Sequence, residues 1–213
     1  MKTLKNLSII SFIGMLVLLL TACSKPETQV TKTATVKVKN TSKVDVPEDI
    51  STLMRAMGIQ QFQEKVVAPD FKLTNLKDKE VSLKDFRGKF VLLNFMATWC
   101  HWCRKEMPHL QKLHDKFKDK DFIIMAVYSD REGAKAVKPF IKKSGYTFTE
   151  NSGTYNSGLL DPTGRVTNMY RVTGTPTTYL INKNGDAIGV AQGYRDWSKK
   201  ESFTLIEKLI NSN

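Results

Sequence analysis

A run of seven residues, Phe90 to Met96, sets the fold class, because it is apolar throughout except for Asn94. Such a run is typical of a strand that is buried on both faces of a sheet. A helical pattern follows from about Cys100 to Lys118, and a second apolar strand follows at Phe122 to Tyr128. Two buried strands joined by a helix indicate a parallel pair, so the sequence predicts an α/β domain with Phe90 to Met96 in its centre.

The remaining elements follow from the same apolar spacing. They are strands at Val81 to Phe86, Thr177 to Ile181 and Ala187 to Ala191, and a helix from Glu132 to Ser144 that ends at Gly145. Asn184-Gly185, between the last two strands, is a strong signal for a β-hairpin. Ser198 and Glu201 form a capping box that predicts the start of the final helix. Together these elements predict three layers, with a mixed sheet between helices.

The first 22 residues have the pattern of an export signal. Lys2 and Lys5 precede an apolar run from Leu7 to Leu20, which is too short to span a hydrocarbon core about 30 Å thick. The following Leu20-Thr21-Ala22-Cys23 resembles the lipobox of bacterial lipoproteins, in which the cysteine is lipidated. We therefore expect Cys23 to anchor the mature protein at the extracytoplasmic face of a bacterial membrane, in the periplasm or at the cell surface. An ordinary signal peptide with a chance cysteine and a short membrane anchor are the alternatives.

Two segments separate the signal from the compact domain. Residues 23–47 are rich in Thr, Lys, Val and Ser and contain no aromatic residue. They bury too little apolar surface to offset the entropy of ordering, which predicts a flexible tether. Residues 48–66 carry apolar side chains near helical spacing and predict a short amphipathic helix. The compact domain is then expected to comprise residues 67–213.

The chain is strongly basic, with a formal net charge of +12, or +10 without Lys2 and Lys5. The basic residues are spread along the sequence, and no zinc-finger, helix-turn-helix or RNA-binding signature accompanies them. Nucleic acid is therefore not expected as a partner. A basic surface beside anionic lipid headgroups fits the predicted anchor better.

The chemistry is concentrated at Trp99-Cys100-His101-Trp102-Cys103. These cysteines follow the central strand at the first turn of a helix, where open α/β sheets usually place their sites. The free N–H groups and the dipole of a helix N-terminus favour an anion, so the pKa of Cys100 is expected below the free value of about 8.5. We predict that Cys100 is the attacking nucleophile and that Cys103 is the resolving thiol of a redox-active disulfide.

Metal binding and a purely structural disulfide explain these cysteines less well. His109 and His114 lie downstream, but five residues of helix would turn their imidazoles roughly 140° apart, and the spacing is too tight for a zinc finger. A disulfide that closes a two-residue loop adds little stability, which favours a reactive bond. Neither a metal nor a cofactor is expected, with copper handling by the thiols and a histidine kept as an alternative.

Several segments around the cysteines match one family. They are Phe71–Leu73, Val81–Lys89, Val91–Phe95, Ala97–Cys100 and Cys103–Pro108. They resemble the thioredoxin superfamily, and more closely its membrane-anchored TlpA/ResA-type thiol-disulfide oxidoreductases with a redoxin domain. The resemblance implies a thioredoxin-like sandwich, with an extra loop at 150–157 inserted before a cis-proline loop at Gly174–Thr177. It also implies that Pro176 flanks Cys100 and that the backbone of Thr175 binds an incoming peptide.

The resemblance assigns a role to one acid and places an asparagine where another acid is usual. Glu106 matches an acid that the TlpA/ResA type keeps near its cysteines, where a desolvated carboxylate can carry the proton of Cys103. A solvated carboxylate in the first turns of the helix is the alternative. Asn94 stands where thioredoxins proper have a buried acid.

The chain also departs from the family pattern. Met96 replaces a usual tryptophan, and His101-Trp102 replaces a dipeptide that often contains proline. A cationic His101 would stabilise the thiolate and make the protein a better oxidant, which weighs against a reducing role. Trp99, His101 and Trp102 are expected to bind substrates, with scaffold packing as the alternative for Trp99.

These features predict an extracytoplasmic, lipid-anchored enzyme that exchanges a dithiol and a disulfide with protein substrates. We expect a monomeric reductant that serves cytochrome c maturation or the repair of oxidised proteins, with electrons from a membrane partner. A disulfide-forming oxidase or isomerase on the same fold is the closest alternative, and a non-enzymatic copper-handling lipoprotein is another. A peroxidase is not expected, because no Pro-x-x-x-Thr/Ser-x-x-Cys pattern ends at Cys100.

Overall fold

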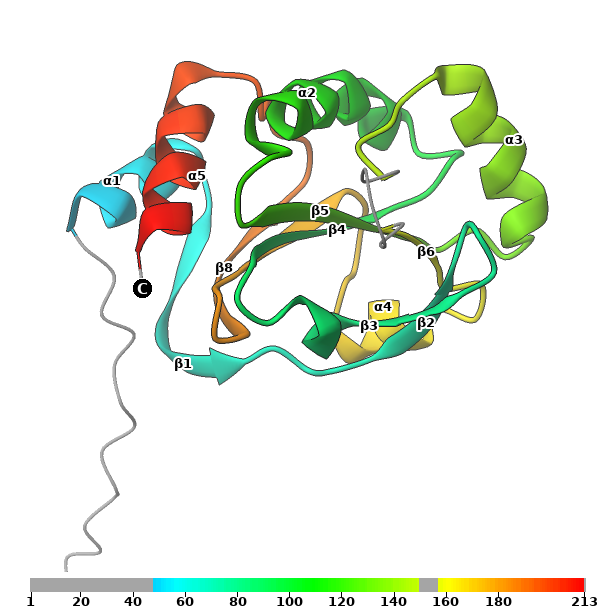
Figure 1. Cartoon of the computed structure of the whole chain (residues 1–213), viewed down its shortest axis with the longest axis horizontal. Coiled ribbons are helices and arrows are strands. Elements are labelled where there is room, and N and C mark those ends of the chain that lie inside the picture. Colours follow the sequence, from blue (N-terminus) through cyan, green and yellow to red (C-terminus); the bar gives the residue numbers. More distant parts are fainter. Residues whose placement is uncertain (1–47, 150–156, 213) are drawn as a thin grey trace, which may run out of the picture. The chain divides into compact units, whose positions relative to one another are not determined.

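The computed structural model describes residues 48–149 and 157–212, which form a mixed sheet with helices on both faces (Figure 1). The predicted signal peptide at 1–22, the tether at 23–47 with Cys23, and all but the last residue of the loop at 150–157 lie outside the described residues. No helix of the described part combines the length and the apolar character needed to cross a membrane.

The described strands form one eight-stranded sheet in the order β1-β8-β7-β4-β5-β6-β2-β3. Their bounds are β1 (Gln60–Val67), β2 (Lys72–Asn75), β3 (Glu80–Ser82), β4 (Phe90–Met96), β5 (Phe122–Tyr128), β6 (Gly158–Leu160), β7 (Thr177–Ile181) and β8 (Asp186–Gln192). Strand β4 pairs in parallel with β5 and antiparallel with β7, and all seven of its residues are buried. The predicted central strand is therefore confirmed, and Asn94 faces Thr178 across the β4–β7 pair.

The helices cover the sheet unequally. They are α1 (Glu48–Ala56), the 3-10 helix η1 (Leu83–Phe86), α2 (His101–Phe117), α3 (Ala134–Ser144), α4 (Arg165–Met169) and α5 (Lys200–Asn211). The four longer helices α1, α2, α3 and α5 share one apolar core with one face of the sheet, and η1 and α4 contribute to the core of the other face (Figure 1). This arrangement confirms the predicted three layers.

The predicted helix over 48–66 is only half helical. Helix α1 ends at Ala56, and Gly58 then adopts a φ of 63°, a left-handed conformation that reverses the chain at low cost for glycine. Residues Gln60–Val67 form the edge strand β1 and pair with β8. The sheet therefore begins before residue 67, because pairing with the free edge of β8 outweighs the weak helical pattern of this stretch.

Two further predicted elements are wrong at their ends. The strand expected over Val81–Phe86 stops at Ser82, because the Asp85 carboxylate accepts the Ser82 N–H at 2.9 Å and closes the turn of η1. The last helix begins at Lys200 with Lys199 as its N-cap, and the predicted capping box is absent. The Ser198 hydroxyl donates to the Asp196 carboxylate at 2.7 Å instead of capping the helix.

Candidate functional site

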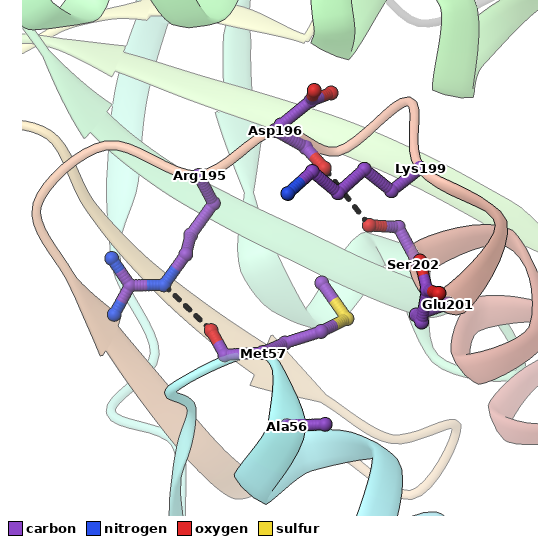
Figure 2. Close-up of a pocket in the computed structure, with 7 residues that line it drawn as sticks. All are labelled: Ala56, Met57, Arg195, Asp196, Lys199, Glu201 and Ser202. Atoms are coloured by element: carbon purple, nitrogen blue, oxygen red, sulfur yellow. Dashed lines mark hydrogen bonds between the residues drawn. The ribbon is translucent and has the colours of Figure 1, made fainter.

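A cavity of about 430 Å³ lies between the end of α1 and the start of α5 (Figure 2). It is lined by Ala56, Met57, Arg195, Asp196, Lys199, Glu201 and Ser202. Neither cysteine lines it, so the sulfur chemistry is located elsewhere. The described residues also contain no group of three or more His, Cys, Asp or Glu side chains arranged to hold a metal ion.

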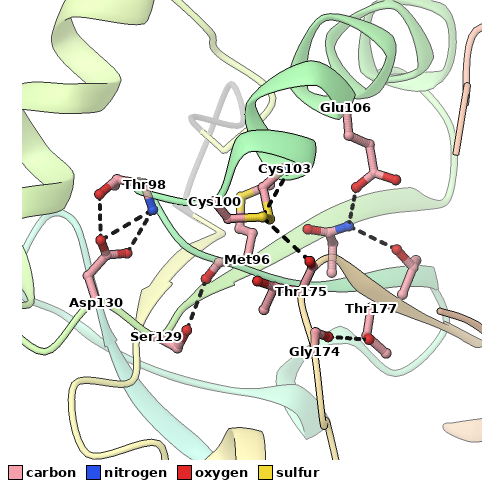
Figure 3. Close-up of a disulfide and its surroundings, with 12 residues drawn as sticks. Met96, Thr98, Cys100, Cys103, Glu106, Ser129, Asp130, Gly174, Thr175 and Thr177 are labelled. Carbon is pink, nitrogen blue, oxygen red and sulfur yellow. Dashed lines mark hydrogen bonds between the residues drawn. A yellow bond between two sulfur atoms is a disulfide. The ribbon is translucent and has the colours of Figure 1, made fainter. Parts of the chain in front are cut away.

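Cys100 and Cys103 form a disulfide at the N-terminus of α2, as the sequence predicts (Figure 3). Strand β4 delivers the chain to a short turn, and Cys100 is the extended N-cap residue of the helix. Its Sγ accepts the backbone N–H of Cys103 at 3.1 Å. Both side chains are buried, with exposed fractions of 6% for Cys100 and 1% for Cys103, so Cys100 is the more accessible sulfur.

The predicted cis-proline loop lies against this disulfide. The Thr175–Pro176 peptide bond is cis, and the carbonyl oxygen of Thr175 is 3.5 Å from the Cys100 Sγ (Figure 3). The Gly174 carbonyl accepts the Thr177 hydroxyl at 2.7 Å, which fixes the turn into β7. The structure thus brings Cys100, Thr175 and Pro176 together as expected from the family resemblance.

A buried acid that sequence reasoning missed holds the turn before Cys100. The Asp130 side chain is 1% exposed, and its two oxygens accept the Thr98 N–H at 3.1 and 3.2 Å as well as the Thr98 hydroxyl (Figure 3). The Ser129 N–H donates to the Met96 carbonyl at 3.0 Å. The available signal was the position of Asp130 just past the buried strand β5, which runs parallel to β4.

Glu106 lies three residues beyond Cys103 on α2 and is fully buried, so the solvated alternative is excluded. Its Oε2 accepts the Asn94 side-chain amide at 2.9 Å, and that amide also donates to the Thr178 hydroxyl at 2.8 Å. Its Oε1 accepts two further N–H groups, which come from the segment after β8.

Burial raises the pKa of Glu106 to about 7, although its hydrogen bonds and the nearby charge of Arg195 lower it. Desolvation therefore outweighs three donors and a cation. At neutral pH both the acid and the carboxylate are populated, and this is the condition under which a group transfers protons most effectively.

The disulfide is bordered by exposed aromatic rings. Trp99 is 69% exposed and Trp102 is 52% exposed, so neither is ordinary scaffold packing. The His101 ring stands edge-on to Trp102 at a centroid distance of 5.4 Å, and the Lys105 Nζ lies 4.8 Å from the centre of the Trp102 ring. The rim of the site therefore combines apolar area with positive charge.

Residues 194–198 are the main part of the surroundings that the sequence did not reveal. The Arg195 N–H and the Trp197 Nε1–H donate to Glu106 Oε1 at 2.9 and 3.0 Å. In the same segment, the Asp196 carboxylate and the Tyr194 hydroxyl lie 2.8 and 3.1 Å from the two ring nitrogens of His109. The one available signal was Trp197, a large aromatic residue in a polar stretch.

Comparison with known proteins agrees with this geometry. The model of the AhpC/TSA family matches residues 65–187. The thiol-disulfide oxidoreductase ResA of Bacillus thuringiensis subsp. konkukian is 38% identical over 136 residues, which cover 64% of this chain and 73% of the relative. ResA of Geobacillus kaustophilus is 40% identical over 126 residues, with coverages of 59% and 67%. The thioredoxin domain of a Bacteroides vulgatus thiol-disulfide oxidoreductase superposes with a TM-score of 0.56 at 32% identity, over 68% of this chain and 96% of that domain.

Proposed function

Since this chain belongs to the AhpC/TSA family and is a ResA-type thiol-disulfide oxidoreductase, we propose that Cys100 and Cys103 are its redox centre. The observation that carries the proposal is the position of the disulfide, which joins the N-cap of α2 to its first turn beside the cis-proline loop. Helix N-termini stabilise thiolates, and the Cys103 N–H already donates to the Cys100 sulfur.

The reducing reaction proceeds in two exchanges. The Cys100 thiolate attacks one sulfur of a substrate disulfide, forming a mixed disulfide and releasing the other substrate sulfur as a thiolate that takes up a proton. Cys103 then loses its proton and attacks the Cys100 sulfur, which releases the second substrate thiolate. The substrate gains two electrons and two protons, and the Cys100–Cys103 disulfide forms again.

Glu106 is proposed as the catalytic group that accepts the Cys103 proton in the second exchange. Its carboxyl follows Cys103 by less than one helical turn, and its pKa of about 7 leaves a carboxylate available at neutral pH. In the opposite direction, the carboxylic acid returns the proton when Cys103 becomes the leaving group.

Substrates are proposed to bind across the rim of the disulfide. The exposed rings of Trp99 and Trp102 take apolar side chains, with His101 at their edge. Thr175 and Pro176 border Cys100 on the other side, where the backbone of Thr175 is placed to bind an extended peptide.

We propose that the protein reduces its substrates. The substrates are disulfides of proteins in cytochrome c maturation or of oxidised proteins. The protein acts as a monomer, and a membrane partner donates its electrons. The resemblance of the sequence to the TlpA/ResA type motivates this choice, whereas His101 between the cysteines favours the alternative of a disulfide-forming oxidase or isomerase. A glutathione titration of the Cys100–Cys103 couple should give a midpoint more negative than about −200 mV, together with reduction of insulin disulfides. A midpoint near about −120 mV without insulin reduction would assign the protein to the oxidases.

The proposed location is the extracytoplasmic face of a bacterial membrane, with Cys23 as the lipidated residue. What supports it is the lysine-flanked apolar run that leads into Leu20-Thr21-Ala22-Cys23. Bacteria that express the full chain should incorporate labelled palmitate into it, and the membrane fraction should retain it. The Cys23→Ala variant should take up no label, and equal labelling of the two proteins would refute the anchor.

A further inference from the structure

The segment from Tyr194 to Ser198 supplies two of the three hydrogen bonds to Glu106. The backbone N–H of Arg195 and the indole N–H of Trp197 both donate to Oε1. The segment has no helical or strand structure of its own, so contacts of its side chains must hold these donors in place. The position of the Arg195 N–H therefore depends on what its side chain contacts.

The Arg195 guanidinium is bonded to the end of α1 (Figure 2). Its Nε donates to the Met57 carbonyl and its Nη2 donates to the Gly58 carbonyl, both at 2.8 Å. Its Nη1 donates to the Tyr194 carbonyl at 2.8 Å and thereby braces its own segment. The Met57 and Gly58 carbonyls belong to the turn that directly follows α1, so the arginine fixes its own segment to the turn that ends this helix.

Helix α1 packs tightly against α5. Ile50 and Met54 are 3% and 0% exposed in the core that α1 shares with α5, and Asp49 forms an ion pair with Lys208 of α5. Arg195 and α1 both lie outside residues 65–187, the part that matches the family model. The contact therefore joins two segments that the family model does not match.

We propose that α1 contributes to the redox site, because through Arg195 it positions a backbone N–H group that holds the Glu106 carboxylate. Arg195 is then a positioning residue, and the inference rests on the proposed function of Glu106. If Arg195 is released from the end of α1, its backbone N–H loses its fixed distance to Oε1, whereas Trp197 stays held by the apolar core. The carboxylate loses stabilisation relative to the acid, so the pKa of Glu106 rises. A smaller fraction of the protein then holds the carboxylate that can accept the Cys103 proton at neutral pH.

In the described part of the site, few other groups lie near Glu106 and can affect its pKa. Asn94 contacts it from β4, Cys103 precedes it on α2, and the charge of Arg195 acts on it directly. The Asp196 carboxylate and the Tyr194 hydroxyl also hold the segment against His109 of α2. A test must therefore separate the position of the segment from the charge of Arg195.

Four variants of the full chain make this separation. Arg195→Lys keeps the charge but loses the fork that bridges two carbonyls, and Arg195→Gln loses both. Gly58→Ala acts from the α1 side, because its Cβ would lie 3.2 Å from the Arg195 Nη2 at a φ of 63°. Gly145→Ala is the matched control, with a φ of 70° at the end of α3 and open space around the added carbon.

The readout is the midpoint of the Glu106 side-chain carboxyl signal in a carbon-13 NMR pH titration, assigned with Glu106→Gln. Arg195→Lys and Gly58→Ala should each raise the midpoint by about one pH unit, which is a tenfold loss of acidity. Arg195→Gln should raise it at least as much, and Gly145→Ala should leave it unchanged.

Each contrary result has a distinct meaning. A midpoint that moves in Arg195→Gln alone would show that only charge acts and would overturn the proposal, as would equal shifts in the two glycine variants. If the Arg195 variants do not fold, Gly58→Ala against Gly145→Ala still decides the matter. If the midpoint shifts as expected but the rate of the Cys103 step does not follow it, the proposed function of Glu106 fails while the link to α1 stands.

Discussion

Replacing Cys103 with serine should convert the protein into a trap that stays covalently bonded to its substrates. Cys100 is the more exposed sulfur and borders the cis-proline loop, so it makes the first attack and forms the mixed disulfide. Without the second thiol, nothing within the chain releases the substrate, and turnover should fall by about 10³-fold or more. A non-reducing gel after incubation with a disulfide-bonded peptide should show a stable adduct that dithiothreitol removes.

Two companion variants give this experiment its controls. Cys100→Ser should form no adduct and show no turnover, because Cys103 is only 1% exposed. In the Cys103→Ser background, Trp102→Ala should slow adduct formation by about tenfold if the exposed ring binds substrate, a loss of roughly 1.4 kcal/mol. An adduct on Cys103 in the Cys100→Ser variant, formed at the same rate, would reverse the assigned roles.

The centre of the sheet could be predicted from the sequence to the residue. Strands β4 and β5 have the bounds expected from their apolar runs. A strand that is buried on both faces is apolar along nearly its whole length, so the apolar run itself marks where the strand begins and ends. The edge could not be predicted in this way. In β1 most side chains remain exposed, and pairing with β8 decided between strand and helix.

The same difference applies to the site. The cysteines and Glu106 act through their side chains, and Pro176 acts through its cis peptide bond, so the residue types and their spacing in the sequence indicate them. Arg195 binds Glu106 through its backbone N–H, a group that every residue except proline carries, so no pattern of residue types predicts this hydrogen bond. Its side chain contacts Met57 and Gly58 at the end of α1, more than 130 positions away along the chain, and only the fold brings these two segments together.

Glu106→Gln is the second change with a large expected effect. The amide cannot accept the Cys103 proton, so the second exchange should slow by about 10²-fold at pH 7, and the rise in rate around pH 7 should disappear from the pH–rate profile. Rapid-mixing kinetics of mixed-disulfide resolution measure this step directly. The first attack by Cys100 should be almost unaffected, because Glu106 is assigned no part in it.

The same variant should be more stable than the wild type at alkaline pH. Burial raises the pKa of Glu106 from 4.5 to about 7, so the folded state holds this proton more tightly than the unfolded state. The stability that the bound proton provides is complete below pH 4.5 and is lost as the pH rises through about 7. A neutral glutamine has no such loss, so its advantage in unfolding free energy should approach about 3 kcal/mol above pH 8 and vanish near pH 4.

The site can accommodate the amide, which makes this comparison a fair one. Among the described residues, the buried Asn94 Oδ1 has no hydrogen-bond partner, so rotation of the Asn94 amide offers an acceptor to the new N–H₂ group. Urea unfolding of wild type and variant between pH 4 and 9 measures the difference, with Glu207→Gln on the exposed face of α5 as the matched control. Parallel stability curves for wild type and Glu106→Gln would show that burial does not perturb this carboxyl. The desolvation that lowers the stability of the folded state at alkaline pH is the same effect that raises the pKa of Glu106 for proton transfer. In that case we therefore expect Glu106→Gln to change neither the stability at alkaline pH nor the rate of the Cys103 step.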